Sequence, residues 1–259
     1  MSKNPPNQSF LSHLESLRWH LMRSIIAIFL GSIIVFLNKS FVFDEIIFAC
    51  KENDFVTYIF LCNISETLCI QDLPFILMNV EMAGQFTMHI LVSLVGGFIL
   101  VFPYLLYEIW EFVAPAMYKS EKKISVLVFF VSFFLFLVGV FFGYYVIIPF
   151  SINFLSSYTI SGIIENNIHF ISFIKTFTTI VITTGILFQL PLIIYCLTKF
   201  NLITTKQLKQ YRRHAFVIIL VLASILTPPD IFSQILIGLP IFLLYELSVL
   251  ISSISTSKQ

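Results

Sequence analysis

Long apolar segments, separated by short polar ones, make up most of the chain. A helix that crosses the roughly 30 Å hydrocarbon layer of a bilayer needs about 20 mostly apolar residues. The run FFVSFFLFLVGVFFGYYVII is apolar on every side, whereas a barrel strand alternates apolar and polar residues over about 10 positions. The pattern therefore predicts an all-α polytopic membrane protein. We expect six transmembrane helices, at residues 21–37, 86–107, 124–150, 176–197, 215–227 and 231–251.

The distribution of Lys and Arg indicates how these spans are oriented. Six spans place both termini on one side of the membrane, and twelve of the fifteen bases fall on that side. The three on the opposite side are Lys39, Lys51 and Lys175. Because short cytoplasmic loops carry the excess of Lys and Arg, we expect both termini in the cytoplasm. A polar stretch precedes the first apolar run and no small-residue cleavage site follows it, so we expect no cleaved signal.

The fifth and sixth predicted spans are short. About a dozen apolar residues lie between His214 and the Thr-Pro-Pro-Asp at 227–230, enough for roughly 20 Å at 1.5 Å per residue. The sixth is also short if it ends before Glu246. Local thinning, shielding by neighbouring helices or inward loops would meet this mismatch, and boundaries misplaced by a few residues would explain it equally well. We expect residues 1–259 to form a single integral membrane domain.

A long outer segment, residues 38–85, separates the first two spans. Unstructured loops of 48 residues are uncommon, so we expect short helices in it. It holds Cys50, Cys62 and Cys69 on the oxidising side. Their spacing does not decide between one disulfide with a spare thiol and no disulfide. The arrangement lacks the paired close ligands of a zinc site. Cys196, in the fourth span, is expected to pack among apolar neighbours.

Composition narrows the function classes. The chain is 58% hydrophobic and 11% charged, where soluble domains carry about 25% charged residues, which excludes an ordinary cytosolic enzyme. A net charge of +1 gives no field that favours nucleic acid. The sequence has no HExxH, no GxSxG and no clustered His or Asp, so we expect neither an enzyme nor a metal site nor a cofactor.

Acidic residues at the inner end of the second span point to a cationic partner. Glu108, Glu111 and Glu121 lie on the predicted cytoplasmic side, where a simple anchor needs only bases. Glu15 adds a carboxylate in the amphipathic HLESLRWHL stretch. Each carboxylate can accept a bidentate pair of hydrogen bonds from a guanidinium, so acids on two elements could bind an arginine pair. The alternative is that Glu121 pairs with a lysine of its own loop.

Prolines and aromatic rings surround these acids. Pro103 and Pro115 restrict the backbone. Aromatic rings settle at membrane interfaces, and four are expected at that depth here: Tyr107, Trp110, Phe112 and Tyr118.

Five motifs, in order along the chain, resemble those of the TatC subunit family of the twin-arginine protein translocase. The family's HLxELR resembles residues 13–18. The other four motifs match Pro103, Tyr107, Trp110, Phe112, Pro115, Tyr118 and Glu121, then Phe188, Gln189, Leu190, Pro191 and Leu192, then Thr227, Pro228, Pro229, Asp230, Ser233 and Gln234, and finally Pro240, Leu244, Tyr245 and Glu246.

The resemblance implies a receptor for signal peptides that carry consecutive arginines, built as a concave bundle. Such a receptor works with TatA- and TatB-type single-span subunits and exports folded proteins with the proton motive force. It implies peptide binding at the cytoplasmic face by Glu121, Glu15, Phe112, Trp110 and Tyr118. It also implies a homo-oligomer in a bacterial inner membrane, an organelle-encoded thylakoid or mitochondrial copy being the alternative.

Contact with the single-span subunits is implied for Gln189, Phe188 and Pro191. The family motif has glutamate or glutamine at position 189, and a glutamine can donate and accept hydrogen bonds but cannot relay a proton. The alternative role for this amide is an internal bond to Thr183 or Thr184.

The remaining motif residues are expected to be structural: Pro103, Pro115, Pro228, Pro229, Asp230 and Gln234. Asp230 would cap the helix that follows it. Glu246 would either snorkel or pair with a base of residues 206–213.

Two features depart from the family pattern. Glu15 lies one residue before the family's acid, a rotation of about 100° on a helix, and residues 50–72 have no counterpart. The alternative function is a six-span small-solute transporter, which should show repeated halves, and we see no repeat.

Overall fold

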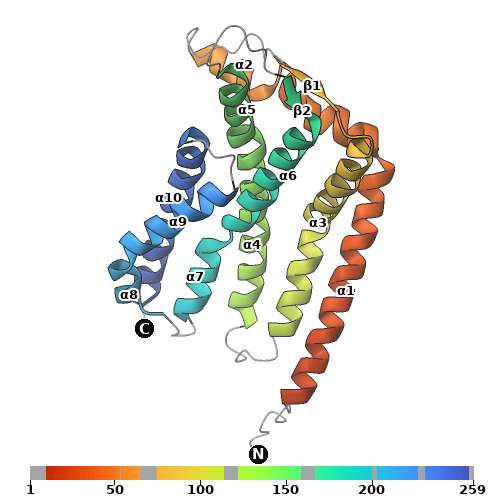
Figure 1. Cartoon of the computed structure of the whole chain (residues 1–259). Helices are drawn as coiled ribbons and strands as arrows, with labels where there is room; N and C mark the ends of the chain where they lie inside the picture. The colour runs from red at the N-terminus through yellow and green to blue at the C-terminus, as the bar shows by residue number, and fades with distance from the viewer. Residues whose placement is uncertain are drawn as a thin grey trace, which may run out of the picture. The chain divides into compact units, whose positions relative to one another are not determined.

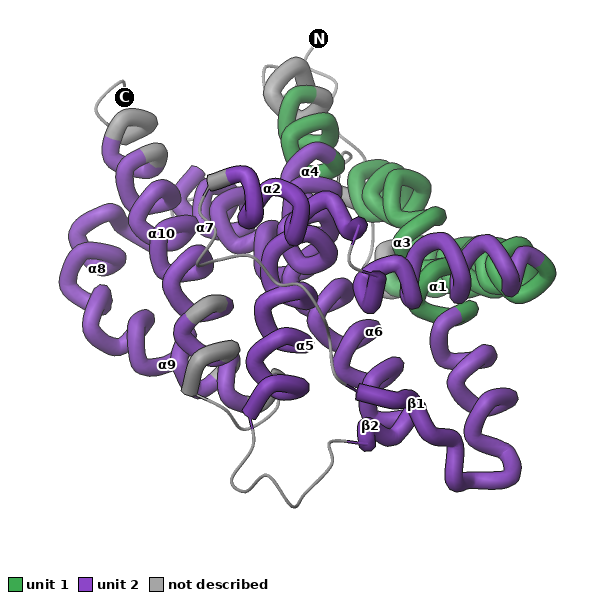
Figure 2. Tube along the Cα trace, turned by 90° about the horizontal axis from the view of Figure 1, so that it is seen from above, with its two compact units in different colours: residues 1–37, 93–133 green, residues 38–92, 134–259 purple. Residues whose placement is uncertain are grey.

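The computed structural model describes residues 10–52, 54–64, 75–113, 122–158, 167–199, 203–226 and 231–256. These residues are mostly helical, with one two-stranded sheet (Figure 1). The chain divides into two compact units (Figure 2). Unit 1 comprises Met1–Leu37 with Ser93–Phe133, and unit 2 comprises Asn38–Val92 with Phe134–Gln259.

Unit 1 contains α1 (Phe10–Leu37), most of α3 (Gly84–Val113) and the first part of α4 (Lys122–Phe142). Unit 2 contains the start of α3, the end of α4 and the remaining elements. In chain order these are η1 (Phe41–Ile47), η2 (Phe48–Lys51), α2 (Val56–Ile64), β1 (Ile76–Met78), η6 (Gly143–Ile147), α5 (Ile148–Ser157), β2 (Asn167–His169), α6 (Phe170–Leu187), α7 (Leu190–Lys199), α8 (Thr205–Gln210), α9 (Arg212–Leu226) and α10 (Ile231–Thr256).

Four helical segments are long and apolar enough to cross a membrane. They are Leu14–Leu37, Gly84–Phe112, Leu127–Ser157 and Phe170–Lys199, and they coincide with the first four predicted spans. Helix α9 has 15 residues, about 22 Å at 1.5 Å per residue, and α10 has 26 residues. Helix α10 therefore continues past Glu246, the residue before which a short sixth span would have ended.

Glycines let α1 and α3 approach closely in unit 1. A Cβ added to Gly97 would lie 2.4 Å from the backbone nitrogen of Ser32, and one added to Gly31 would lie 3.0 Å from the carbonyl of Gly97. Small residues at such crossings bring backbones into van der Waals contact, the main attraction between helices in lipid. Within Leu14–Leu37, only Gly31 and Val35 are buried, so most of this apolar helix presents its side chains outward.

The third and fourth predicted spans are each formed by more than one element. Residues Gly143–Ile147 form a π-helical turn between α4 and α5, and a Cβ on Gly143 would clash with the Thr184 hydroxyl of α6. Helices α6 and α7 are separated at Phe188 and Gln189. Pro191 explains this break, because its missing N–H cannot donate to the carbonyl of Leu187.

The outer segment contains the expected short helices, η1, η2 and α2. The hydroxyl of Thr57 in α2 donates to the carbonyl of Tyr145 at 2.5 Å, and that of Tyr144 donates to the carbonyl of Ile46 at 2.8 Å. These bonds attach the segment to η6. Strand β1 pairs in parallel with β2, with Leu77 opposite Ile168, a pairing that the sequence did not predict.

The cysteines of this segment take different states. Cys62 is disulfide-bonded, whereas Cys50 and Cys196 are free. The structure thus adopts the first of the two alternatives, one disulfide with Cys50 as a spare thiol. Cys50 is fully buried, and this burial raises the pKa of its thiol to about 12, although a hydrogen bond with Tyr144 acts in the opposite direction.

Helices α8 to α10 are joined by polar contacts that involve several motif residues. Gln234 of α10 donates from Nε2 to the carbonyl of Leu220 in α9 at 3.0 Å, and the hydroxyl of Tyr245 donates to the carbonyl of Leu208 at 2.8 Å. Glu246 pairs with Arg212 at 2.8 Å. Of the two roles expected for Glu246, the structure shows the ion pair.

We predict that Cys50 resists alkylation in the folded protein. The reactive species is the thiolate, and at pH 8 a thiol with a pKa near 12 is ionised in about one molecule in ten thousand. In a Cys196→Ser variant in detergent, maleimide at pH 8 should leave Cys50 unmodified by peptide mass spectrometry and modify it after denaturation. Cys62, as the control, should react only after reduction. Labelling of Cys50 in the native protein would contradict its placement.

Candidate functional site

A cluster of acidic, aromatic and histidine side chains lies in unit 1, where α1 begins and α3 ends. Helix α1 contributes His20, and α3 contributes Tyr104, Glu108 and Glu111. Residues three and four apart on a helix are neighbours on its surface, so the three α3 residues share one face. The cluster forms because α1 and α3 run antiparallel: Gly31 follows His20 by as many residues as Gly97 precedes Glu108.

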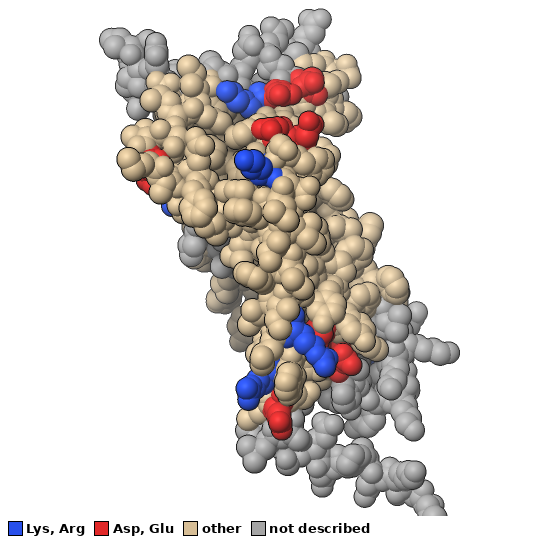
Figure 3. All heavy atoms as spheres, turned by 90° about the vertical axis from the view of Figure 1, so that its right-hand side faces the viewer, with Lys and Arg blue, Asp and Glu red and all other residues tan. Residues whose placement is uncertain are grey.

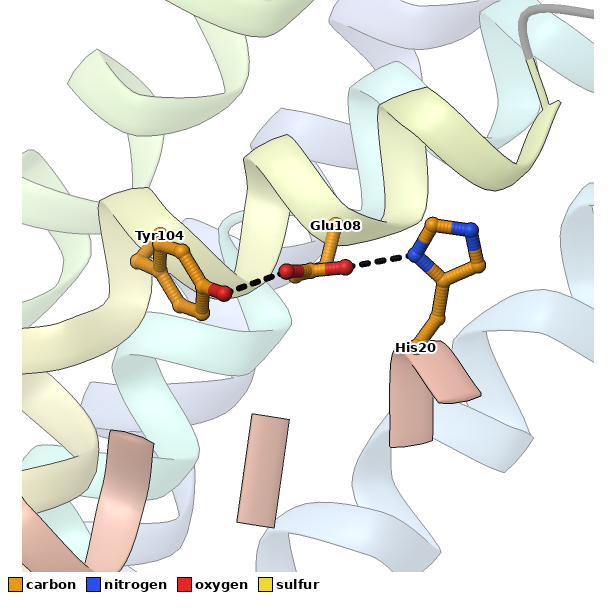
Figure 4. Close-up of polar contacts among 3 residues, drawn as sticks. All are labelled: His20, Tyr104 and Glu108. Atoms are coloured by element: carbon orange, nitrogen blue, oxygen red, sulfur yellow. Dashed lines mark hydrogen bonds and ion pairs between the residues drawn. The ribbon is translucent and has the colours of Figure 1, made fainter. Parts of the chain in front are cut away.

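Glu108 is the centre of this cluster. Its side chain is 3% exposed, and Nδ1 of His20 lies 2.5 Å from its Oε2. The hydroxyl of Tyr104 donates to its other oxygen, so both carboxylate oxygens are bonded (Figure 4). A buried carboxylate is costly unless it is paired and hydrogen-bonded, and here one partner comes from each helix. The contact therefore couples α1 to α3.

Aromatic rings extend the cluster along α3. The ring of His20 meets that of Phe112 edge-on at 6.0 Å, which supports the imidazole beside Glu108. Tyr107 lies 6.4 Å from Tyr104 and 6.2 Å from Trp110 between ring centroids. Trp110 and Phe112 are half-buried, so part of each ring is accessible.

The other acids of this end are exposed. Glu15 on α1 and Glu111 on α3 are both exposed, and a carboxylate oxygen of Glu111 lies within 4.8 Å of ligand atoms of His20 and Glu108. On the face drawn in Figure 3, the acidic and basic side chains lie in a few small groups that contain both signs, and most of the described surface carries neither. The exposed carboxylates are therefore available to a ligand, whereas Glu108 is already bonded.

Among the described residues, His20, Glu108 and Glu111 form the group whose ligand atoms come close enough to hold a metal ion. Nδ1 of His20 and one oxygen of Glu108 are bonded to each other. The geometry is thus that of a hydrogen-bonded histidine and carboxylate with an exposed acid nearby.

Several residues that the sequence singled out lie outside the described residues. They are Pro115, Tyr118, Glu121, Pro228, Pro229 and Asp230. Of the predicted peptide-binding set, the structure places Glu15, Trp110 and Phe112 in unit 1. Pro103 lies inside α3.

The residues predicted to contact partner subunits lie at the break between α6 and α7, in unit 2. Phe188 and Pro191 are buried and Gln189 is half-buried. The ring of Phe142 packs on that of Phe188 at 5.6 Å. The Thr184 hydroxyl donates to the carbonyls of its own helix, at Ile180 and Val181.

Sequence reasoning found Glu108 as an acid of this end but missed its partners. The spacing of Tyr104 and Glu108, four residues apart on one helix, was a usable signal. His20 had no such signal, because a single sequence does not show which residue of one helix faces which residue of another.

Taken together, apolar helices of membrane-spanning length and a charged cluster at their ends define a polytopic membrane protein. Residues 12–240 match the family model described as Sec-independent protein translocase protein (TatC). The chain therefore belongs to the TatC family, which confirms the resemblance seen in the sequence. The family is one of translocase subunits involved in protein transport, not of enzymes.

Relatives and solved structures agree with this assignment. The TatC protein of Blattabacterium sp. subsp. Periplaneta americana is 37% identical, over 99% of this chain and 100% of the relative. The TatC protein of Helicobacter pylori strain 26695 is 35% identical, over 93% and 85%. A crystal structure of the twin arginine translocase receptor TatC has a TM-score of 0.75 at 28% identity, covering 94% of this chain and 99% of that one. A second, in DDM, has a TM-score of 0.76 at 30% identity, covering 93% and 99%.

We predict that His20→Ala destabilises the protein by about 1–3 kcal/mol, because it leaves a buried carboxylate with one partner fewer. Glu111→Gln is the matched control: it removes an exposed acid of the same cluster and should change stability by about 0.5 kcal/mol or less. Denaturant unfolding in detergent measures both. The double variant His20→Ala/Glu108→Gln should lose less than the sum of its single changes, since the two residues interact. Strict additivity would show that they are not coupled.

Proposed function

We propose that this protein is the receptor subunit of a twin-arginine translocation system in a bacterial inner membrane. It binds signal peptides with consecutive arginines at its cytoplasmic face. With TatA- and TatB-type single-span subunits, and as a homo-oligomer, it moves folded proteins across the membrane with the proton motive force. Membership of the TatC family supports the assignment to a twin-arginine translocation system, and the exposed acids of unit 1 support the position of the peptide-binding site.

The proposed topology has six spans, with both termini in the cytoplasm and a single membrane domain. The four long apolar segments supply the first four spans, and α9 and α10 supply the last two. Arg18 and Arg23 lie in the N-terminal half of α1, and Lys39 follows the helix. The excess of bases at the N-terminal end fits the positive-inside rule. With about 22 Å of length, α9 requires local thinning of the bilayer or shielding by neighbouring helices.

The observation that carries the proposal is the division of acids at the end of unit 1. Glu108 is buried and bonded to His20 and Tyr104, while Glu15 and Glu111 are exposed. A guanidinium binds a carboxylate through two parallel charge-assisted hydrogen bonds, so a pair of arginines needs two accessible acids. Half-buried Trp110 and Phe112 add aromatic faces on which guanidinium groups stack.

Glu121 is proposed as the main counter-charge of the peptide. It immediately precedes Lys122, the first residue of α4, and it follows α3 by a short connection that also holds Tyr118. Both flanking helical ends belong to unit 1. Its position in the sequence therefore assigns it to the same unit as the exposed acids of α1 and α3.

The break between α6 and α7 is proposed as the contact for the single-span subunits. Pro191 leaves the carbonyl of Leu187 without its helical donor, and the half-buried amide of Gln189 lies beside it in sequence. Polar groups within a membrane favour contact with protein over contact with lipid. A transmembrane helix with a polar side chain could therefore contact the chain at this break.

We predict that Glu121→Gln abolishes crosslinking of a twin-arginine signal peptide to the purified protein, because the two arginines lose their main counter-charge. Glu81→Gln, an exposed acid outside unit 1, removes the same charge and should leave crosslinking unchanged. Photo-crosslinking in detergent, quantified against wild type, provides the readout. Undiminished labelling of the Glu121 variant would contradict this assignment.

Gln189→Leu should leave peptide crosslinking intact but abolish assembly with the single-span subunits and transport. The leucine removes the amide and keeps a similar volume, so the break loses its hydrogen-bonding side chain. Gln210→Leu, an exposed glutamine of α8, is the control and should assemble normally. Co-purification of the subunits and export of a folded reporter separate the steps. If Gln189→Leu lost the peptide instead, the binding site would lie in unit 2.

A further inference from the structure

A cavity of about 760 Å³ lies in unit 2 and is lined only by residues of that unit. Its size falls in the range of small-molecule sites, about 300–1,000 Å³. Lining residues come from η1 and the residues directly before and after it, from β1 and the turn after it, from the first two turns of α3 and from the start of α6.

The cavity lies where three apolar segments end. Lys39 follows the segment Leu14–Leu37, His89 is in the second turn of Gly84–Phe112, and Phe170 is the first residue of Phe170–Lys199. In a bilayer, the ends of membrane-spanning helices lie at the depth of the lipid headgroups, where aromatic rings are enriched. Four phenylalanines line the cavity, including Phe86 and Phe170. The cavity therefore meets lipid headgroups and the start of their acyl chains.

Opposite charges share the wall of the cavity without neutralising each other. Lys39 and Asp44 both line it and both are exposed. Neither forms an ion pair with the other or with any residue that the structure describes. At the edge of a bilayer, the attraction between such a charge and a ligand of opposite sign is stronger than in bulk water.

We propose that this cavity binds a phospholipid with a zwitterionic headgroup. The Lys39 ammonium receives the phosphate, and the Asp44 carboxylate receives the cationic amine. Phe86, 62% exposed, and Ile90, 49% exposed, lie four residues apart on α3 and so form a continuous apolar surface that leads from the cavity into the span. An acyl chain covers this surface.

The charge pattern selects between lipid classes. An anionic headgroup would satisfy Lys39 but place its net charge near Asp44, and a zwitterionic headgroup satisfies both. Phosphatidylethanolamine and phosphatidylcholine both carry a phosphate and a cationic amine. The primary ammonium of ethanolamine donates hydrogen bonds to a carboxylate, whereas choline binds to aromatic faces. Under the proposed topology, the lipid belongs to the outer leaflet.

Native mass spectrometry of the full-length protein tests the proposal, with phosphatidylethanolamine, phosphatidylcholine and phosphatidylglycerol added separately. Wild type should retain a zwitterionic lipid more strongly than phosphatidylglycerol. Lys39→Gln should weaken retention of all three by about tenfold, the loss of one charge-assisted contact. Asp44→Asn should weaken phosphatidylethanolamine and strengthen phosphatidylglycerol. Retention of phosphatidylglycerol should thus fall in Lys39→Gln and rise in Asp44→Asn, and a general loss of folding cannot produce changes of opposite sign.

Matched controls carry the same charge changes outside the cavity. Lys175→Gln and Glu45→Gln alter exposed residues that do not line it, and both should behave as wild type. Equal effects of the cavity variants and the controls would overturn the proposal, as would the absence of any preference between lipids. Since peptide crosslinking is not used, failure here leaves the receptor proposal unaffected.

Two further arms identify the occupant. Glycerophosphoethanolamine, which carries the headgroup without acyl chains, should compete only weakly, and full competition would show that the ligand is not a lipid. A photoreactive residue in place of Phe86, in membranes that hold the whole system, should gain the mass of a phospholipid. A covalent product with a second copy or with another protein would show that the cavity is a protein interface, and would overturn the proposal.

Discussion

An acid on an apolar helix constrains everything packed around it, and in this protein that acid is Glu108. Removal of its charge from water costs several kcal/mol unless partners are placed accurately. One partner, Tyr104, comes from its own helix, but His20 comes from α1. The bond therefore fixes the register of two antiparallel helices that are otherwise held by close contact at glycines. The same register brings Gly31 against Gly97, so polar pairing and small-residue packing support one arrangement.

In unit 2, the polar groups that must be bonded within an apolar segment are those of the backbone. Within lipid, every N–H and carbonyl has to be satisfied by protein, so irregular backbone is tolerated only where other groups cover it. The π-helical turn at Gly143–Ile147 and the break before Pro191 both lie in apolar segments, and Thr184 packs against Gly143. Close packing of α4 and α6 thus surrounds the irregular turn. The break at Gln189 marks the point where a partner contact is proposed.

Much of the fold follows from hydrophobicity alone, because the bilayer sets the length of each span. The first four spans were predicted in this way, whereas the short helices before β1 were expected because unstructured loops of that length are uncommon. Contacts between distant segments were not: β1 and β2 are three residues each, too short for a recognisable alternation, and the spacing of the cysteines did not decide between disulfide and thiols. At the candidate site, the acid Glu108 and the ring of Phe112 were visible in the sequence. Their common neighbour, His20, depends on the register of two helices, which a single sequence does not show.

The scarcity of charge makes the pairing of each acid informative. Glu246 is bound by Arg212 and Glu108 by His20, so neither needs an external cation. Glu111 is exposed, and its carboxylate lies within 4.8 Å of ligand atoms of the buried pair, where a second negative charge is repelled by Glu108. An arriving guanidinium would relieve that repulsion without entering the buried pair. The internal His20–Glu108 hydrogen bond and the proposed peptide site are thus complementary: the first holds α1 and α3 in register, and the second uses the acids that this register leaves exposed.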